Sequence, residues 1–212
     1  MAGRSTRSGA AQQHVAESAP DGTVLDASAL RAAIAAVESR ASSSADLPPL
    51  APEAHEAATA ALRLLRHRPR SEHELRQRLF AKEFAPEAVS EALERVRAWG
   101  LLDDADFAAE WVRGRRRRRG RSRGALEREL RDKGVAEGHI ADAVSGIDES
   151  DERRQASELV RARLERRPAA AVSGPEAQGE RRRLVAFLAR RGYPTGLAMS
   201  VVDAELASHA SR

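Results

Sequence analysis

Apolar residues recur every three or four positions along three successive segments between Pro52 and Gly100. This spacing places them on one face of an α-helix, so each segment predicts a short amphipathic helix. Ser71, followed three residues later by Glu74, predicts a capping box at the start of the second helix, and Pro86 predicts the start of the third. The residues that we expect on the buried faces are Ala61, Leu62, Leu65, Leu75, Leu79, Phe80, Val89, Leu93, Val96 and Trp99.

The leucine pair of the second helix returns twice farther along the chain. Leu75 and Leu79 recur 51 residues later as Leu126 and Leu130, and these recur a further 58 residues later, at positions 184 and 188. A period of about fifty residues is typical of tandem units that are too small to fold alone and pack on their neighbours. The sequence therefore predicts an all-α protein of three tandem three-helix repeats, at residues 52–102, 103–148 and 149–208.

The segment that precedes the repeats has a different composition. Residues 1–51 are rich in Ala, Ser, Gly and Asp, and their one apolar pattern, from Leu25 to Val37, has no partner face nearby. We therefore expect a mostly disordered N-terminal tail with one nascent helix. The first residues lack the apolar core of a signal peptide, and no stretch approaches the roughly 18 apolar residues of a membrane span. Both observations indicate a cytoplasmic protein.

Composition excludes several kinds of chemistry. The chain has no cysteine, which rules out disulfides, thiolate metal sites and a cysteine nucleophile. Its six histidines are scattered without the spacing of metal ligands, and it contains no phosphate-binding loop, dinucleotide fingerprint or zinc-protease motif. We therefore predict no enzyme activity, no cofactor and no metal site.

A dense block of arginines follows the expected start of the second repeat. Five of them are consecutive and extend past one full helical turn, so no single solvated face can hold them all. Such a block is stabilised by a polyanion, by an acidic partner surface or by acids of its own fold. The last interpretation stays open, because residues 103–149 contain 11 basic and 11 acidic side chains. The candidate contact residues are Arg113, Arg115, Arg116, Arg117, Arg118, Arg119, Arg121 and Arg123.

The residues before this block have a structural explanation. Asp103 can cap the next helix, and Asp104 can interact with its dipole, so a catalytic or metal-binding role is the weaker interpretation. Phe107 and Trp111 are four residues apart, which places both on one helix face. Aromatic rings could stack on nucleic-acid bases, but we expect this pair in the core of the second repeat.

Three stretches of the chain resemble one known family. LLDDADFAAEWV at 101–112, followed by the arginine-rich segment and by LERELRDKGV at 126–135, looks like the signature of the RecX regulatory proteins. ALRLLRHRPRSEHELRQRLFAKEF at 61–84 and LVAFLARRGY at 184–193 are similar to the flanking units of that family. The resemblance covers residues 54–207. It assigns a scaffold role to Asp103, Asp104, Phe107, Trp111, Leu126, Leu130, Lys133 and Gly134.

The resemblance implies a function as well as a fold. It implies an elongated, curved body of three repeats that acts without catalysis as a modulator of the RecA recombinase. Such a protein would bind the RecA filament on single-stranded DNA as a monomer, and would lower its recombinase, ATPase and coprotease activities in DNA repair and the SOS response. A helical protein that binds DNA on its own is the alternative. The absence of asparagine from the chain disfavours sequence-specific base reading in that alternative.

Overall fold

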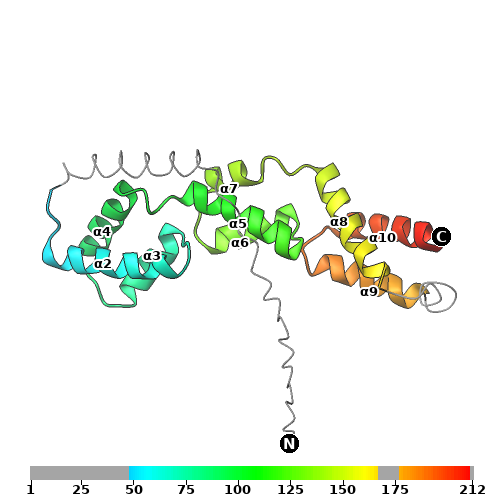
Figure 1. Ribbon diagram of the computed structural model, residues 1–212, viewed down its shortest axis with the longest axis horizontal. Helices are drawn as coiled ribbons and strands as arrows, with labels where there is room; N and C mark the ends of the chain where they lie inside the picture. The colour runs from blue at the N-terminus through cyan, green and yellow to red at the C-terminus, as the bar shows by residue number, and fades with distance from the viewer. Residues whose placement is uncertain (1–47, 167–176, 211–212) are drawn as a thin grey trace, which may run out of the picture. The chain divides into compact units, whose positions relative to one another are not determined.

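The computed structural model describes residues 48–166 and 177–210, and this part of the chain contains nine α-helices and no strand (Figure 1). The all-α prediction is therefore confirmed. None of these helices is both long and apolar enough to cross a membrane. Most of the expected N-terminal tail, including the Leu25–Val37 pattern, lies outside the described residues. The helices are α2 (Pro52–His67), α3 (Glu72–Phe80), α4 (Pro86–Ala98), α5 (Asp104–Arg119), α6 (Arg123–Asp132), α7 (Glu137–Val144), α8 (Glu149–Leu164), α9 (Ala177–Ala189) and α10 (Thr195–Ala210).

The nine helices form three consecutive groups of three, each with its own apolar core. Leu75 and Leu79 are fully buried in the first core, as are their counterparts Leu126 and Leu130 in the second. The third core includes the fully buried residues 184 and 188. The largest apolar side chains are buried within single groups, so other side chains make the contacts between groups.

Two expectations for the first repeat are wrong. Phe80 is not buried but 44% exposed, because it follows Leu79 by one residue at the end of α3 and so lies about 100° away around the helix. The capping box at Ser71 is only half formed. The Ser71 hydroxyl accepts a hydrogen bond from the Glu74 backbone N–H at 3.2 Å, but the Glu74 carboxylate pairs with Arg68 and Lys133 instead of returning to the cap.

A joint between the first and second groups is made at the ends of their middle helices, α3 and α6. The Ser71 hydroxyl, at the start of α3, donates to the Lys133 carbonyl at the end of α6 over 2.6 Å. The Lys133 ammonium reaches Glu74 at 2.8 Å. The backbone N–H of Glu72 donates to Asp104 Oδ1 at 2.8 Å. This joint is therefore polar, and it also satisfies N–H groups of α3 that have no partner within that helix.

The joint between the second and third groups repeats this arrangement. Ser122, 51 residues after Ser71, donates its backbone N–H to the Arg191 carbonyl at 3.1 Å. Arg123, 51 residues after Glu72, donates its backbone N–H to Glu152 Oε1 at 2.7 Å. In both joints the N-terminal end of one middle helix meets the C-terminal end of the next, so the helix dipoles lie head to tail.

Glycines with positive φ make these joints possible. Gly134 (φ +70°) ends the turn after α6, and a Cβ there would collide with the side chain of His73. Gly192 (φ +91°) is equivalent in the third group, and a Cβ there would lie 2.5 Å from the Cβ of Ala125. The first group carries Glu83 (φ +67°) at the same position, the one non-glycine residue with positive φ in the described chain.

Candidate partner-binding surface

The arginine block forms the C-terminal half of α5 and the turn that follows it. Asp103 starts this helix by accepting hydrogen bonds from the backbone N–H groups of Ala105 (2.8 Å) and Asp106 (3.0 Å). Gly120, with left-handed backbone, ends it. Acids therefore lie at the N-terminal end and arginines at the C-terminal end, the order that the helix dipole favours.

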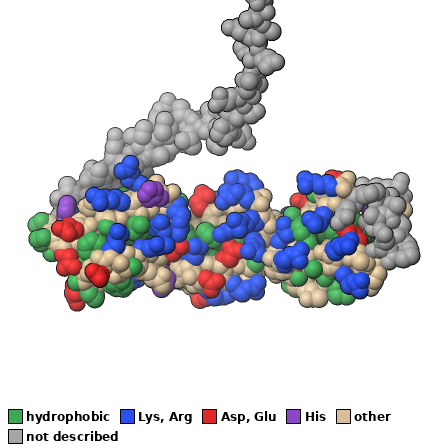
Figure 2. All heavy atoms as spheres, turned by 90° about the horizontal axis from the view of Figure 1, so that it is seen from below, with side chains coloured by type: hydrophobic (Ala, Val, Ile, Leu, Met, Phe, Trp, Pro, Cys, Tyr) green, Lys and Arg blue, Asp and Glu red, His purple; other side chains and the backbone are tan. Residues whose placement is uncertain are grey.

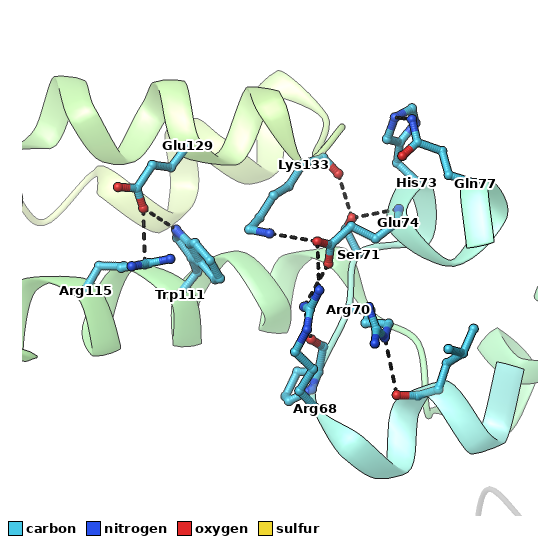
Figure 3. A network of polar contacts seen from close by, with 12 residues as sticks. Arg68, Arg70, Ser71, His73, Glu74, Gln77, Trp111, Arg115, Glu129 and Lys133 are labelled. Carbon is cyan, nitrogen blue, oxygen red and sulfur yellow. Dashed lines mark hydrogen bonds and ion pairs between the residues drawn. The ribbon is translucent and has the colours of Figure 1, made fainter. Parts of the chain in front are cut away.

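Glu129 on α6 holds two of the eight arginines in place. Its carboxylate accepts a hydrogen bond from Trp111 Nε1 at 2.9 Å and forms ion pairs with Arg115 Nε at 3.2 Å and Arg121 Nε at 2.9 Å. Figure 3 shows Trp111 between Arg115 and Lys133. The Arg115 guanidinium lies 4.1 Å from the centre of the indole ring and the Lys133 ammonium 4.2 Å from it, both within cation–π range.

The anchored arginines lie in a crowded positive environment. Burial lowers the pKa of the Arg115 guanidinium below its ordinary value. Glu129 opposes this shift, but Arg119, Arg121 and Arg118 add to it. Arg121 also donates to the Arg190 carbonyl at 2.8 Å, which ties the block to the third repeat. These contacts assign a structural role to Arg115 and Arg121 beside any role in binding.

Three other arginines of the block are also engaged within the fold. Arg113 pairs with Glu110 one turn earlier on the same helix at 2.6 Å. Arg123 pairs with Glu127 at 3.0 Å and donates to the Ile147 carbonyl at 3.2 Å. The Arg116 carbonyl accepts from Gln155 of the third repeat at 3.2 Å, and one buried guanidinium nitrogen of Arg116 has no hydrogen-bond partner in the described part of the chain.

Arg117, Arg118 and Arg119 differ from Arg113, Arg115, Arg121 and Arg123, which form ion pairs, and from Arg116, which is partly buried. All three are exposed, and none has an ion pair with any described residue. They occupy the last turn of α5, next to Gly120. We call these three exposed arginines the free arginine turn.

The positive surface continues from this turn into the third repeat. Burial lowers the pKa of Arg191, and the neighbouring cations Arg163, Arg121 and Arg190 lower it further. Arginines of the second and third repeats are therefore close enough to repel one another. Figure 2 shows Lys and Arg side chains over all three groups of helices on the face seen from below, with acidic side chains among them.

The residues expected to form a scaffold lie in different parts of the fold. Phe107, Leu126 and Leu130 are buried in the second core, and Trp111 is partly buried against it. Asp104 accepts the hydrogen bond from Glu72, and its burial raises the pKa of its carboxyl above the ordinary value. Lys133 and Gly134 belong to the joint with the first repeat. Within residues 48–166 and 177–210, no group of three or more His, Asp or Glu side chains could hold a metal ion.

Sequence reasoning missed the residues that organise this surface from outside the block. Glu129 is one acid among several on α6, and nothing in its local pattern distinguishes it from Glu127. Gln155 joins the second and third repeats, since it accepts a hydrogen bond from the Tyr193 hydroxyl at 3.1 Å and donates to the Arg116 carbonyl. The sequence does indicate that Ser71 and Ser122 cap their helices, because each precedes a repeated leucine pattern. It does not indicate that these residues contact the next repeat.

Comparison with known proteins relates the chain to one family. The family model of the first three-helix domain of RecX matches residues 57–95, and that of the second three-helix domain matches residues 103–144. A regulatory protein RecX of Mycobacterium avium is 46% identical over 157 residues, which cover 74% of this chain and 88% of that protein. The chain belongs to the RecX family.

Other RecX proteins support this assignment. A regulatory protein RecX of Mycobacterium tuberculosis is 44% identical over 166 residues, covering 78% of this chain and 95% of that protein. The crystal structure of RecX from Lactobacillus salivarius matches with a TM-score of 0.61 at 16% identity, and the match covers 74% of this chain and 98% of that one. At this identity the similarity shows a shared fold.

Proposed function

We propose that this RecX protein binds the RecA recombinase and its filament on single-stranded DNA, and that binding inhibits or tunes the recombinase, ATPase and coprotease activities of RecA in DNA repair and the SOS response. The observation that carries the proposal is the free arginine turn, which presents three exposed cations that form no ion pair with any described residue, in a chain that is 44–46% identical to regulatory RecX proteins. The protein acts by binding alone, as a monomer in the cytoplasm.

The arrangement of the surface suits a regulator that recognises an assembled filament. Arg115 and Arg121 are held by Glu129, so the end of α5 is fixed in position before any partner arrives. A preorganised group loses less conformational freedom on binding than a mobile one. Arginine can bind phosphate or carboxylate in a bidentate geometry, so the free arginine turn suits both the DNA phosphates and an acidic surface of RecA.

The proposal is tested by measuring affinity for RecA-coated and bare single-stranded DNA over a range of salt concentrations. A protein that only coats DNA loses affinity steeply, with a log–log slope of about −0.7 per phosphate neutralised. We expect tighter binding to RecA-coated DNA and a shallower slope, because protein contacts that release no counterions contribute. Equal affinity and equal slope for both ligands would support the stand-alone DNA-binding alternative and contradict the proposal.

A further inference from the structure

A second basic feature lies beside the end of α5, in a cleft between α8 and α9. The cleft has a volume of about 340 Å³ and is lined by Leu159, Ala162, Arg163, Arg166, Phe187 and Arg191. It adjoins the arginine block, since a Cβ on Gly120 would lie 2.6 Å from Leu159 Cδ1. Among the described residues, no acidic side chain lines it.

The floor of the cleft is apolar and its walls are cationic. The ring of Phe187 is buried, with the guanidinium carbon of Arg191 3.7 Å and that of Arg163 4.9 Å from its centre. Arg191 uses one terminal nitrogen to donate to the Phe187 carbonyl at 3.3 Å. The Phe187 side chain therefore holds two guanidinium groups at the mouth of an apolar hollow.

The cations of this cleft lack anionic partners. Neither Arg163, Arg166 nor Arg191 forms an ion pair with any residue in the described part of the chain. The Nε atom of Arg191 is buried and has no hydrogen-bond partner there. A buried donor without an acceptor is unfavourable, and an anion that reached it would supply the missing hydrogen bond.

We propose that this cleft binds an acidic peptide segment of a protein partner, with an apolar side chain of the peptide against Leu159 and Ala162 and its carboxylates on Arg163, Arg166 and Arg191. The inference deepens the proposed function, on which it rests for the existence of a protein partner. Carboxylates fit guanidinium groups in a bidentate geometry, and an apolar side chain gains free energy when it covers the floor.

The geometry favours a peptide over a nucleic acid. Proteins that bind single strands offer open aromatic faces on which bases stack along a basic groove. Phe187 offers no such face, because its ring is buried beneath the two guanidinium groups. The volume lies at the small end of the usual range for ligand sites, roughly 300–1,000 Å³, which suits one apolar side chain and its acidic neighbours.

The test uses the full chain and three labelled probes at low ionic strength. The first is a short peptide of Asp and Glu with one central Phe, the second is the same peptide with Gly in place of Phe, and the third is a short oligothymidine. We expect the Phe peptide to bind, and the double variant Arg163→Gln with Arg166→Gln to weaken its binding about tenfold or more. The matched control, Arg63→Gln with Arg66→Gln, removes two exposed arginines with the same spacing from α2 and should leave binding unchanged.

Four results separate this inference from the proposed function. Equal binding of the Phe and Gly peptides would overturn the inference, because the apolar floor would not be used. If the double variant lost binding to oligothymidine but kept its binding to the Phe peptide, the cleft would be a nucleic-acid site and the inference would be overturned. Failure to bind the peptide together with preference for RecA-coated DNA would overturn the inference alone. Tight peptide binding without that preference would support the inference and overturn the proposed function.

Discussion

The indole nitrogen of Trp111 on α5 donates a hydrogen bond of 2.9 Å to the carboxylate of Glu129 on α6. The same carboxylate holds Arg115 and Arg121, so a single acidic side chain joins the aromatic anchor of the second repeat to its arginine block. Partly buried charge-assisted contacts of this kind are stronger than exposed ion pairs. Glu129 therefore determines where the end of α5 lies and which arginines stay free for a partner.

Replacement of Glu129 by Ala should lower the free energy of unfolding by about 2 kcal/mol, because it leaves the indole N–H without its hydrogen-bond acceptor and two guanidinium groups without their ion-pair partner. In a Trp99→Phe background, the fluorescence of Trp111 should shift to longer wavelength as the ring becomes more exposed to water. Urea denaturation and emission spectra measure both effects. The control is Glu127→Ala on the same helix, which removes one ion pair with Arg123 and should have a smaller effect on stability and none on emission. An identical response to both substitutions would show that the shared carboxylate has no special role.

Replacement of Arg117, Arg118 and Arg119 together by Gln should leave folding intact, since Gln is a good helix former and none of the three has an ion pair among the described residues. Binding to the RecA filament should fall by an order of magnitude or more, and most of the suppression of RecA ATPase should be lost. Filament binding and ATP hydrolysis are the measurements.

A control for this triple variant comes from the first repeat. Arg63, Arg66 and Lys82 are exposed and have no ion pair with any described residue, so their replacement by Gln removes the same charge elsewhere. We expect that control to inhibit RecA nearly as well as the parent. If the two triple variants inhibit equally, the free arginine turn is only a solvated face.

Substitutions at two equivalent positions should change the free energy of unfolding in opposite directions. Gly134→Ala should destabilise the protein by about 2 kcal/mol or more, because it adds a Cβ where φ is +70° and where His73 already lies. Glu83→Gly should stabilise it by up to about 1 kcal/mol, because it relieves the same backbone conformation at a position with no neighbouring repeat. Thermal and urea unfolding of the two variants measure this difference. Destabilisation of similar size at both positions would contradict the account of the joint.

The joint between the first and second repeats should weaken in acid. Burial raises the pKa of Glu74, but hydrogen bonds from Arg68 and Lys133 outweigh burial and hold its pKa at about 2, below the ordinary 4.5. A carboxyl whose folded pKa is depressed contributes stability above its unfolded pKa and loses that contribution as pH falls through the folded value. The advantage of the parent over Glu74→Gln should therefore be present at neutral pH and shrink between pH 4.5 and about 2.

Denaturation at a series of pH values measures that difference. Its size should be modest, because the carboxylate is partly exposed and solvent screens it. Glu94→Gln, which removes an exposed carboxylate without an ion pair in the described chain, is the control and should show no such trend. A constant gap between parent and Glu74→Gln from neutral pH to pH 2 would contradict the role of Glu74 in the joint.

Much of the fold follows from local patterns in the sequence. The pairs Leu75–Leu79 and Leu126–Leu130 are buried as predicted, because burial of a helix face depends on spacing that is visible in the chain. Ser71 and Ser122 cap their helices because a hydroxyl can satisfy the first free N–H groups wherever a helix begins. The prediction that Phe80 is buried is wrong, because apolar character alone does not tell which side of a helix end faces the core.

The division of the arginine block could not be predicted in the same way. Whether Arg115 or Arg117 is anchored depends on how α5 lies against α6, and so on the position of Glu129. The spacing within either helix does not contain that packing angle. The role of Lys133 was hidden for a related reason, since its partners Ser71 and Glu74 belong to another repeat.

The serine and glycine that meet at each joint have no counterparts at the outer ends of the first and third repeats. A further repeat packed before the first one would contact the turn at Glu83, where the second and third repeats have Gly134 and Gly192. A further unit beyond the third would need a capping hydroxyl at position 180, where a buried glutamate lies inside α9. The same contact is therefore unfavourable between copies of the protein, because it would bring Glu83 of one copy against Glu180 of another, where neither the glycine nor the serine is present.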